Sequence, residues 1–445
     1  MSSATATTPA DDTASTDRSI RTTPSISIGA AIIAKKKGSP APVCRLILLI
    51  ASVAAATFFL NYHTPESAPS SRRLNGLQID PKTVLSKNQP DNNDRSLMCQ
   101  LLPQVPDDLP WLPVRAHERG PRCSSYSKGI NLSRCCIGQC RQFNKKITPG
   151  QQTRGRSDFK GLFMKPHLPG LVSMPTMLEH LHYFVQQKSF ERSTNSNNSH
   201  HNEPPIDTCV LWYIGRSLSQ DQATAAICKL TSLGYEIPDK KKCGIDDKFG
   251  LLSGTCELAS QSSQHCPKIR VRHDWQPRGY TPNPKRDNEA GPIIYNYGVH
   301  ANSPEAIEDW MENGFRPLYD DFQANDDMGR YPFMWREHEP QHFATKDGTY
   351  GGSGTKCQGS DVYDNYRNEA AIRYFEREGL QDKIPVIKSF NALTSLDRFH
   401  LGKGDCTHYC YSPWRFDLTW HGIALGLQKL PEQQAACMQL YNIDA

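Results

Sequence analysis

The feature that most constrains the fold is an alternation of short apolar runs with longer segments of helical periodicity. Residues 209–214, CVLWYI, form a continuous run of β-forming side chains, typical of a strand buried on both faces of a parallel sheet. In residues 218–233 apolar side chains recur at helical spacing, and Gly234 offers a stop. Strand and helix patterns then alternate at 292–297, 304–313 (with Gly314 as its stop), 331–335, 364–378 and 384–388. We therefore expect an α/β fold with a doubly wound, mostly parallel sheet flanked by helices.

Residues of the kinds used in acyl transfer follow these expected strands. In a doubly wound sheet, ligands bind beyond the carboxyl ends of the strands. A serine nucleophile needs a base, the base needs an acid that fixes its tautomer, and the developing oxyanion needs hydrogen-bond donors. The chain offers every kind after its expected strands: Ser217, then Asn296, Gly298 and His300, then Arg336, Glu337 and His342, and finally Asp405 and His408.

The stretch GDCTHYC, residues 404–410, places an acid and a histidine three residues apart. We expect it to follow a fourth strand and to form a turn or the first turn of a helix, where residues at this spacing lie on one side. The carboxylate of Asp405 then reaches Nδ1 of His408, and Nε2 faces outward. Cys406 and Cys410 are expected to hold the loop so that the pair keeps its aim.

An apolar segment near the N-terminus predicts a membrane anchor. Residues 46–60 carry no charge, and the segment 46–62 approaches the length needed to cross a bilayer. Positive charge gathers on its N-terminal side, which places residues 1–45 in the cytosol as a disordered tail. A cleaved signal peptide is the alternative, and both readings deliver the rest of the chain to the secretory lumen. Residues 63–98 are polar and are expected to form a disordered stem.

The cysteines agree with a lumenal location. Of the 15 cysteines, Cys44 precedes the anchor, which leaves an even number that can pair in an oxidising compartment. The cluster at 135–140 in the Cys-rich region 99–204 is expected to form disulfides, since it lacks the spacing and histidines of a zinc site. Sequons begin at Asn131 and Asn197. The net charge of +5 is modest and mixed. We expect no nucleic-acid partner, no metal and no cofactor.

Four sequence blocks, taken in order, resemble one family. Residues 214–222, IGRSLSQDQ, look like the Gly-Asp-Ser block of the plant trichome-birefringence-like proteins, which belong to the PC-esterase group of the GDSL/SGNH superfamily. Residues 295–300, YNYGVH, are similar to their Asn-Thr-Gly-His block, and 335–357 to their block of Arg-Thr, His-Phe, Gly-Gly and Cys. Residues 405–410, DCTHYC, match their final Asp-Cys-Ser-His-Trp-Cys. The resemblance covers about 205–425, within an expected catalytic domain at 205–430.

The resemblance implies an SGNH-like fold and the transfer or hydrolysis of O-acetyl esters on polysaccharides or glycoconjugates. It also implies a location typically in the Golgi. Together with the expected anchor, this predicts a single-pass protein of the Golgi or another secretory-pathway membrane with a lumenal catalytic domain. Ser217 would be the nucleophile, His408 the general base and Asp405 its orienting partner. Gly215, through its backbone, and Asn296 would donate hydrogen bonds to the oxyanion. Around them, substrate-binding candidates with a structural role as the alternative are Gly298, His300, Arg336 and His342, where Arg336 is expected to pair with Glu337.

One residue departs from the family pattern. Where the family has aspartate before the serine, this chain has Arg216. Its guanidinium is expected to stabilise an oxyanion, to pair with Glu337 or Asp221, or to mark a site that no longer works. Three hypotheses therefore stay open, namely a glycan O-acetyltransferase with an unidentified acetyl donor, a hydrolytic acetylesterase, and a non-catalytic glycan-binding protein.

Overall fold

The computed structural model describes most of the chain after residue 98. The described residues are 99, 101–114, 126–127, 130–131, 164–196, 205–247, 250–275, 288–352, 355–360, 362–402, 404–409, 411–430, 433, 434 and 437. The expected tail, anchor and stem, the cysteine cluster 135–140, Cys410 and Asn197 lie outside them. Within the described part of the chain, we found no helix with both the length and the apolar character needed to cross a bilayer.

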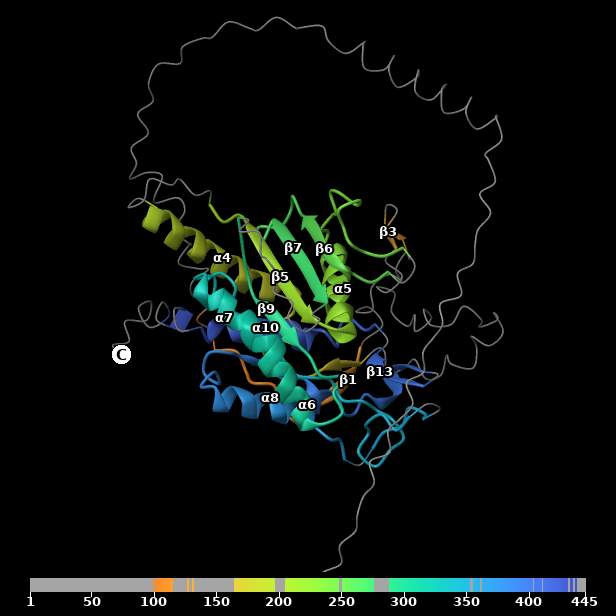
Figure 1. Cartoon of the computed structure of the whole chain (residues 1–445). Helices are drawn as coiled ribbons and strands as arrows, with labels where there is room; N and C mark the ends of the chain where they lie inside the picture. Colours follow the sequence, from red (N-terminus) through yellow and green to blue (C-terminus); the bar gives the residue numbers. More distant parts are fainter. Residues whose placement is uncertain are drawn as a thin grey trace, which may run out of the picture. The chain divides into compact units, whose positions relative to one another are not determined.

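A seven-stranded sheet forms the centre of the described chain (Figure 1). Its order is β11-β10-β9-β5-β7-β6, and β8 also pairs with β5. Every pairing is parallel except that of β6 with β7, so the sheet is mixed and mostly parallel. The strands are β5 (Thr208–Gly215), β6 (Gly254–Ala259), β7 (Lys268–Trp275), β8 (Glu289–Ala290), β9 (Ile293–Asn296), β10 (Phe333–Arg336) and β11 (Val386–Ile387). The expected α/β class is confirmed.

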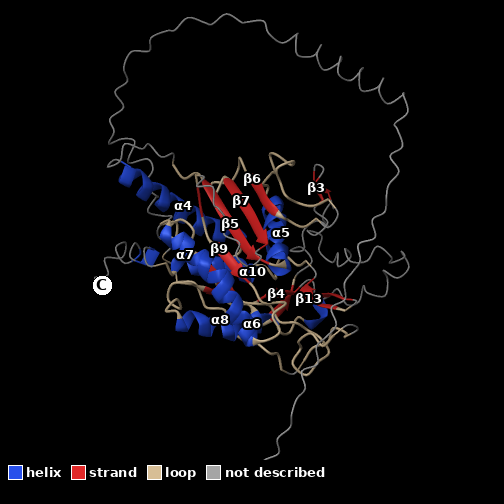
Figure 2. Cartoon of the chain, viewed as in Figure 1, coloured by secondary structure: helices blue, strands red, loops and turns tan. Residues whose placement is uncertain are grey.

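Helices cover both faces of this sheet, as Figure 2 shows. They are α4 (Met174–Ser196), α5 (Ser217–Ser232), α6 (Pro304–Trp310), the π-helical η5 (Met311–Phe315), α7 (Arg316–Ala324), α8 (Tyr366–Arg377), α9 (Phe390–Leu393), the 3-10 turn η6 (Asp397–Phe399) and α10 (Asp417–Gln428). The expected stop at Gly314 is wrong. The chain stays helical through η5 into α7, and the missing side chain of Gly314 makes room for the indole of Trp310, whose Nε1 lies 3.1 Å from where a Cβ would be.

The alternation of side chains along β5 creates two cores. Cys209, Leu211 and Tyr213 belong to one buried cluster, which includes apolar residues of α4, α5 and α10. Val210, Trp212 and Ile214 belong to a second cluster, with apolar residues of α6, α7 and α8. Successive residues of a strand point to opposite faces, so a strand between two helical layers must be apolar throughout. This is why the run 209–214 shows no polar alternation.

Three small two-stranded sheets lie apart from the central sheet. They pair β1 (Trp111–Pro113) with β4 (Met164–Pro166), β2 (Tyr126–Ser127) with β3 (Ile130–Asn131), and β12 (His400–Gly402) with β13 (Asp405–Tyr409). The Asp405 and His408 pair therefore lies on a strand of its own, where a turn or helix start was expected. That strand is separated from β11 by α9 and η6.

Disulfides join segments that are distant in sequence. Those between described cysteines are Cys99–Cys437, Cys209–Cys266, Cys243–Cys256 and Cys357–Cys406. Cys406 thus bonds to Cys357, which fixes β13 to the segment before α8. Parts of the region 99–204 share the core of the expected catalytic domain, because α4 packs into the same cluster as α5 and α10.

Candidate active site

The candidate site lies where the sheet changes direction. After β5 the chain builds β6 and β7 on one side, and it later builds β9, β10 and β11 on the other. In open α/β sheets this switch point opens a crevice at the carboxyl ends of the two central strands. Ser217 is the first residue of α5, directly after β5, and Asn296 is the last residue of β9, the neighbouring strand.

Gly215 allows these two strand ends to approach closely. Its φ is +150°, and a Cβ on it would lie 2.0 Å from the carbonyl oxygen of Asn296 and 2.4 Å from Oγ of Ser219. No side chain fits there. The position before Arg216 and Ser217 must therefore be glycine if β5 and β9 are to end side by side.

Ser217, His408 and Asp405 form a continuous hydrogen-bonded chain. His408 Nε2 lies 2.7 Å from Ser217 Oγ. On the other side of the ring, His408 Nδ1 lies 3.0 Å from Asp405 Oδ2 and 3.1 Å from Oδ1. An ionised carboxylate only accepts hydrogen bonds, so Nδ1 carries the proton and Nε2 presents its lone pair to the serine hydroxyl. This is the arrangement that a serine nucleophile and its base require.

The local backbone explains how two residues of one strand can meet. Between the pairs His400–Tyr409 and Gly402–Asp405, β13 has three residues and β12 only one, so β13 bulges. Asp405 Oδ1 accepts hydrogen bonds from the backbone N–H groups of Thr407, at 3.2 Å, and His408, at 3.0 Å. Burial alone raises the pKa of Asp405, but the hydrogen bonds and charge of His408 and the two N–H groups outweigh it, and the pKa is lowered.

The side-chain amide of Asn296, an expected oxyanion donor, is only partly engaged in another hydrogen bond. The side-chain amide of Asn296 donates to the carbonyl of Arg336 at 2.8 Å, which ties the end of β9 to the end of β10. An amide nitrogen has two hydrogens, so one remains for a ligand. The first helical bond of α5 is donated by Gln220 to the carbonyl of Arg216. The N–H groups at the start of α5, including that of Ser217, therefore have no partner within the helix.

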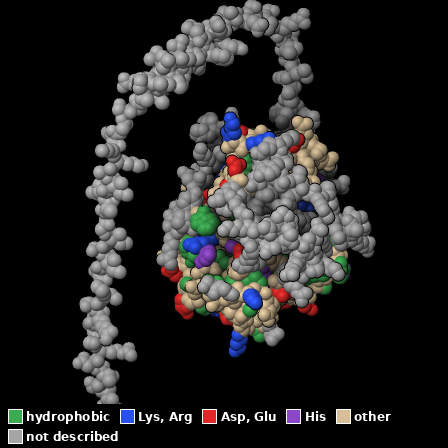
Figure 3. All heavy atoms as spheres, turned by 90° about the vertical axis from the view of Figure 1, so that its right-hand side faces the viewer, with side chains coloured by type: hydrophobic (Ala, Val, Ile, Leu, Met, Phe, Trp, Pro, Cys, Tyr) green, Lys and Arg blue, Asp and Glu red, His purple; other side chains and the backbone are tan. Residues whose placement is uncertain are grey.

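Gly298 and His300 lie on the loop that follows β9. The carbonyl of Gly298 accepts from Nε of Arg367 at 2.9 Å, and that nitrogen also reaches Ala301 O at 3.2 Å. His300 is exposed at the surface. Its ring is still partly removed from water, and this effect, followed by the charges of Arg216, His408 and Arg367, lowers its pKa. His300 therefore lies near both the candidate base and Arg216. In Figure 3, histidine side chains (purple) lie next to Lys or Arg side chains (blue) on one face of the molecule.

Arg336 lies beneath the site and does not pair with Glu337. It is 1 % exposed and bonds to Glu339 at 3.2 Å, and the other oxygen of Glu339 bonds to Arg415 at 2.6 Å. Glu337 instead accepts from two backbone N–H groups at the start of α9, those of residues 389 and 390. Adjacent residues at the end of a strand point to opposite faces, so Arg336 and Glu337 cannot share one pocket. The expected ion pair is wrong.

His342 is held by structural hydrogen bonds. Its Nε2 donates to the carbonyl of Thr394 at 2.9 Å. Its Nδ1 faces His400 Nε2 at 2.5 Å and the hydroxyl of Tyr409 at 3.2 Å. His400 in turn lies 3.1 Å from the carbonyl of His408 through its Nδ1. His342 therefore supports the strand that carries His408 and does not reach the serine.

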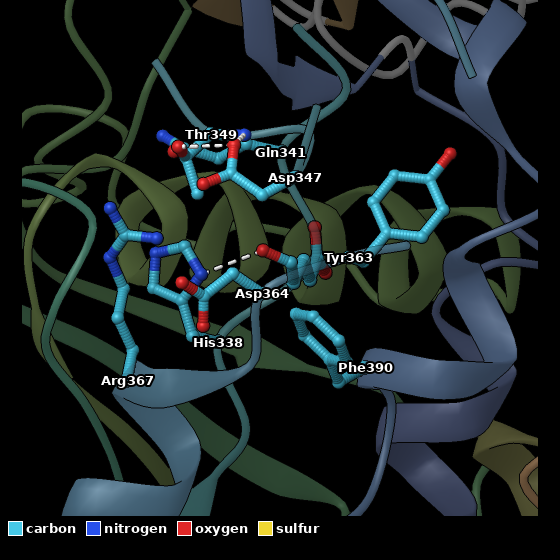
Figure 4. A pocket seen from close by; sticks show the side chains of 9 residues that line it. His338, Gln341, Asp347, Thr349, Tyr363, Asp364, Arg367 and Phe390 are labelled. Carbon is cyan, nitrogen blue, oxygen red and sulfur yellow. Dashed lines mark hydrogen bonds between the residues drawn. The ribbon is translucent and has the colours of Figure 1, made fainter. Parts of the chain in front are cut away.

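The structure adds residues that the motifs did not indicate. Figure 4 shows a small pocket next to the Gly298 loop, with Arg367 and His338 on one side and Tyr363 and Phe390 on the other. Nδ1 of His338 donates to the carbonyl of residue 339 at 2.7 Å, and burial places its pKa well below the usual value. Only Arg367 falls inside an expected helix, and the other three lie between the expected elements, where a single residue carries no signal of its own.

Arg216 pairs with neither of its expected partners. The carboxylate of Glu337 accepts hydrogen bonds from the backbone at the start of α9. Among the described residues, no carboxylate lies within ion-pair distance of the Arg216 guanidinium.

Comparison of the chain with protein-family models, with curated proteins and with solved structures gave no match in any of the three. The resemblance to the trichome-birefringence-like proteins therefore rests on the motifs alone, and the site must be interpreted from its own geometry.

Proposed function

We propose that this chain is an acyl-transferring enzyme that moves O-acetyl groups on glycans through an acetyl-Ser217 intermediate, on an SGNH-like scaffold. The observation that carries the proposal is the hydrogen-bonded chain from Ser217 Oγ through His408 to Asp405, with distances of 2.7 Å and 3.0 Å. Ser217 of α5 meets His408 and Asp405 of the hairpin formed by β12 and β13. The imidazole of His408 has the tautomer that base catalysis needs. General base assistance of this kind contributes about 10²- to 10⁴-fold in rate.

The reaction follows from the positions of the protons. Ser217 Oγ attacks the acetyl carbonyl while His408 Nε2 takes the hydroxyl proton, and Asp405 stabilises the imidazolium. The donor alcohol leaves with that proton, and acetyl-Ser217 remains. A sugar hydroxyl then gives its proton to Nε2 and attacks the acetyl-serine, which frees Ser217 and forms the new ester. The proposed donors to the developing oxyanion are the N–H groups at the start of α5 and the second N–H of Asn296.

The proposed setting is a single-pass secretory-pathway membrane, such as that of the Golgi, with this domain in the lumen. The sequence supports it through the apolar segment 46–62 and its positive N-terminal flank. Disulfides between described cysteines agree with an oxidising compartment. The proposed partners are a polysaccharide or glycoconjugate acceptor and an acetyl donor.

Hydrolysis is a second candidate, because the site is open to water. The side chains of His408 and Asp405 are 23 % and 27 % exposed. Water can therefore reach Nε2 of the base and replace the sugar hydroxyl in the second step. The same three residues then act as an acetylesterase.

The test is covalent labelling of the full-length chain, purified in detergent. We expect 4-nitrophenyl acetate to leave an acetyl group on the peptide that contains Ser217, detected by mass spectrometry after acid quenching. The matched control is Ser219→Ala, because Ser219 lies on the same helix, is buried and bonds to the carbonyl of Ile214. Ser219→Ala should keep the adduct and Ser217→Ala should lose it. An adduct that persists in Ser217→Ala, or none in the wild type, would refute the enzymatic proposal.

Product analysis then separates the two reactions. If labelled acetyl appears on an added acceptor oligosaccharide, the chain is a transferase. If it appears only as acetate, the chain is an esterase.

A further inference from the structure

The side chain of Arg216 is held beside the nucleophile by two aromatic rings. Arg216 is the residue between Gly215 and Ser217, directly before α5. Its Cζ lies 5.4 Å from the ring centre of Tyr297 and 5.8 Å from that of Trp310. These two rings stack on each other with centres 3.5 Å apart and planes 5° from parallel. The guanidinium is thus positioned by two buried rings, one directly after β9 and one at the end of α6.

The geometry shows that the rings do not neutralise this charge. The Cζ atom of Arg216 lies within 6 Å of both ring centres, which is the range of a cation–π contact. Such a contact attracts the guanidinium and helps to position it, but an aromatic ring carries no net charge. The rings therefore hold Arg216 without supplying an anion.

The described chain supplies no anion either. Arg216 makes no ion pair with any described residue, and its buried Nε atom has no hydrogen-bond partner there. The other arginines near the site have partners within the chain. Arg336 and Arg415 share Glu339, and Nε of Arg367 donates to backbone carbonyls. The carboxylate of Asp405 is taken by His408. Arg216 is therefore a positioned cation without a counter-charge.

Its surroundings are positive as well. The guanidinium of Arg367 is a second positive group nearby, since its charge and that of Arg216 both lower the pKa of His300. The start of α5 adds the positive end of a 16-residue helix dipole at the same point. Several positive groups converge beside Ser217, and they favour a negatively charged group on whatever binds there.

We propose that Arg216 binds a carboxylate of the sugar presented to Ser217, so that the substrate is an acidic glycan built with uronic or similar sugar acids. The planar guanidinium matches a carboxylate with two parallel hydrogen bonds. The expected preference in catalysis rests on the proposed function. The binding of a carboxylate by Arg216 does not depend on it. Arg216 is here a specificity-determining residue, and the aspartate of the resembled family could not play this part.

A charge-assisted hydrogen bond that replaces two hydrated partners gives roughly 10- to 100-fold in affinity. We therefore expect the full-length chain to prefer the O-acetylated methyl glycoside of glucuronic acid over that of glucose by about 10- to 100-fold in kcat/KM. The two compounds differ only in whether carbon 6 is a carboxylate. Added salt should reduce the preference, because the site is partly exposed.

Variants at one position decide whether Arg216 is responsible. Arg216→Gln should reduce the ratio of the two kcat/KM values to about one, and Arg216→Lys should keep part of it, because a charge remains without the planar fork. Equal losses with both compounds in Arg216→Gln would assign Arg216 to oxyanion stabilisation and overturn the proposal. An unchanged ratio in Arg216→Gln, or no preference in the wild type, would also overturn it.

Binding measurements keep the inference testable if the enzymatic proposal fails. Calorimetric titration of Ser217→Ala with the two glycosides requires no turnover. We expect tighter binding of the acidic glycoside by about tenfold or more, and the loss of this difference when Arg216→Gln is added. Equal affinities of Ser217→Ala for both compounds would refute the inference whatever the labelling experiment shows. Absence of labelling with a preserved difference in affinity would refute only the catalytic proposal.

Discussion

Replacing Gly215 by alanine tests the close approach of β5 and β9 on which the site depends. Two separate costs follow from the structure. At φ +150° a side chain strains the backbone by about 1–3 kcal/mol. The new Cβ would also lie 2.0 Å from the carbonyl oxygen of Asn296, whereas real Cβ atoms keep at least 3.0 Å, so the strand ends must separate by about 1 Å. Overpacking of this kind costs about 1–3 kcal/mol.

We therefore expect Gly215→Ala to lower the free energy of unfolding by about 2–6 kcal/mol, a large part of the 5–15 kcal/mol typical of a domain. Urea denaturation followed by circular dichroism measures this. Two glycines serve as matched controls. Gly379 has φ +64° and open space around its Cβ position, so Gly379→Ala shows strain alone, about 1–2 kcal/mol. Gly244 has a carbonyl oxygen 2.2 Å from its Cβ position and no positive φ, so Gly244→Ala shows the clash alone.

The activity of the same variant gives a second measurement. A displacement of about 1 Å between Asn296 and Ser217 should slow acetylation of Ser217 by about 100-fold in protein that is still folded. The reasoning fails if Gly215→Ala is no less stable than Gly379→Ala, or if it acetylates at the wild-type rate. Either result would mean that β5 and β9 do not end in contact.

Three further predictions concern charged groups. Asp405→Asn should slow acetylation of Ser217 by about 10⁴-fold, because the amide favours the wrong tautomer of His408, and an unchanged rate in a quenched-flow assay would contradict the triad. Glu339→Gln should cost about 3–5 kcal/mol of unfolding free energy, since it leaves Arg336 and Arg415 buried without a carboxylate, and a urea titration showing under 1 kcal/mol would contradict it. Burial raises the pKa of Asp417 from 3.8 to about 7, so the native state holds this proton longer than the unfolded state and stability falls as pH rises between those values. At about 1.4 kcal/mol per pH unit, the loss of unfolding free energy reaches at most about 4 kcal/mol. Asp417→Asn should remove this pH dependence. Parallel curves of unfolding free energy against pH for the wild type and Asp417→Asn would count against the prediction.

The central part of the fold could be predicted because its signals are local. The run at 209–214 is apolar at every position, as burial between two helical layers demands, and the helical period begins at once after it. Strand β7, KIRVRHDW, was missed although its alternation of apolar and polar residues is a strand pattern, because the expected strands were chosen from continuous apolar runs. Arg270 and Arg272 of that strand pair with the buried Glu289, a contact between distant segments that no local pattern shows.

The chemistry of the site was easier to predict from the sequence than its geometry. The residue types at 217, 405 and 408 indicated a nucleophile, an acid and a base, and the structure brings them into hydrogen-bond contact. The bulged hairpin that carries Asp405 and His408 was not predicted, because its pairing with β12 and its bond to Cys357 are tertiary. The partner of Arg336 was misassigned because adjacent positions were treated as neighbours in space.

The separation of the triad along the chain has a consequence for biosynthesis. Ser217 and His408 are 191 residues apart, and β13 follows every strand of the central sheet. Before β13 has been translated, the nascent chain holds the proposed nucleophile but not the proposed base, so on the proposed function it cannot acylate itself or anything else. A product that ends before β13 keeps all the strands of the sheet and no catalytic pair. On the proposed function, activity therefore begins only after β13 has been made.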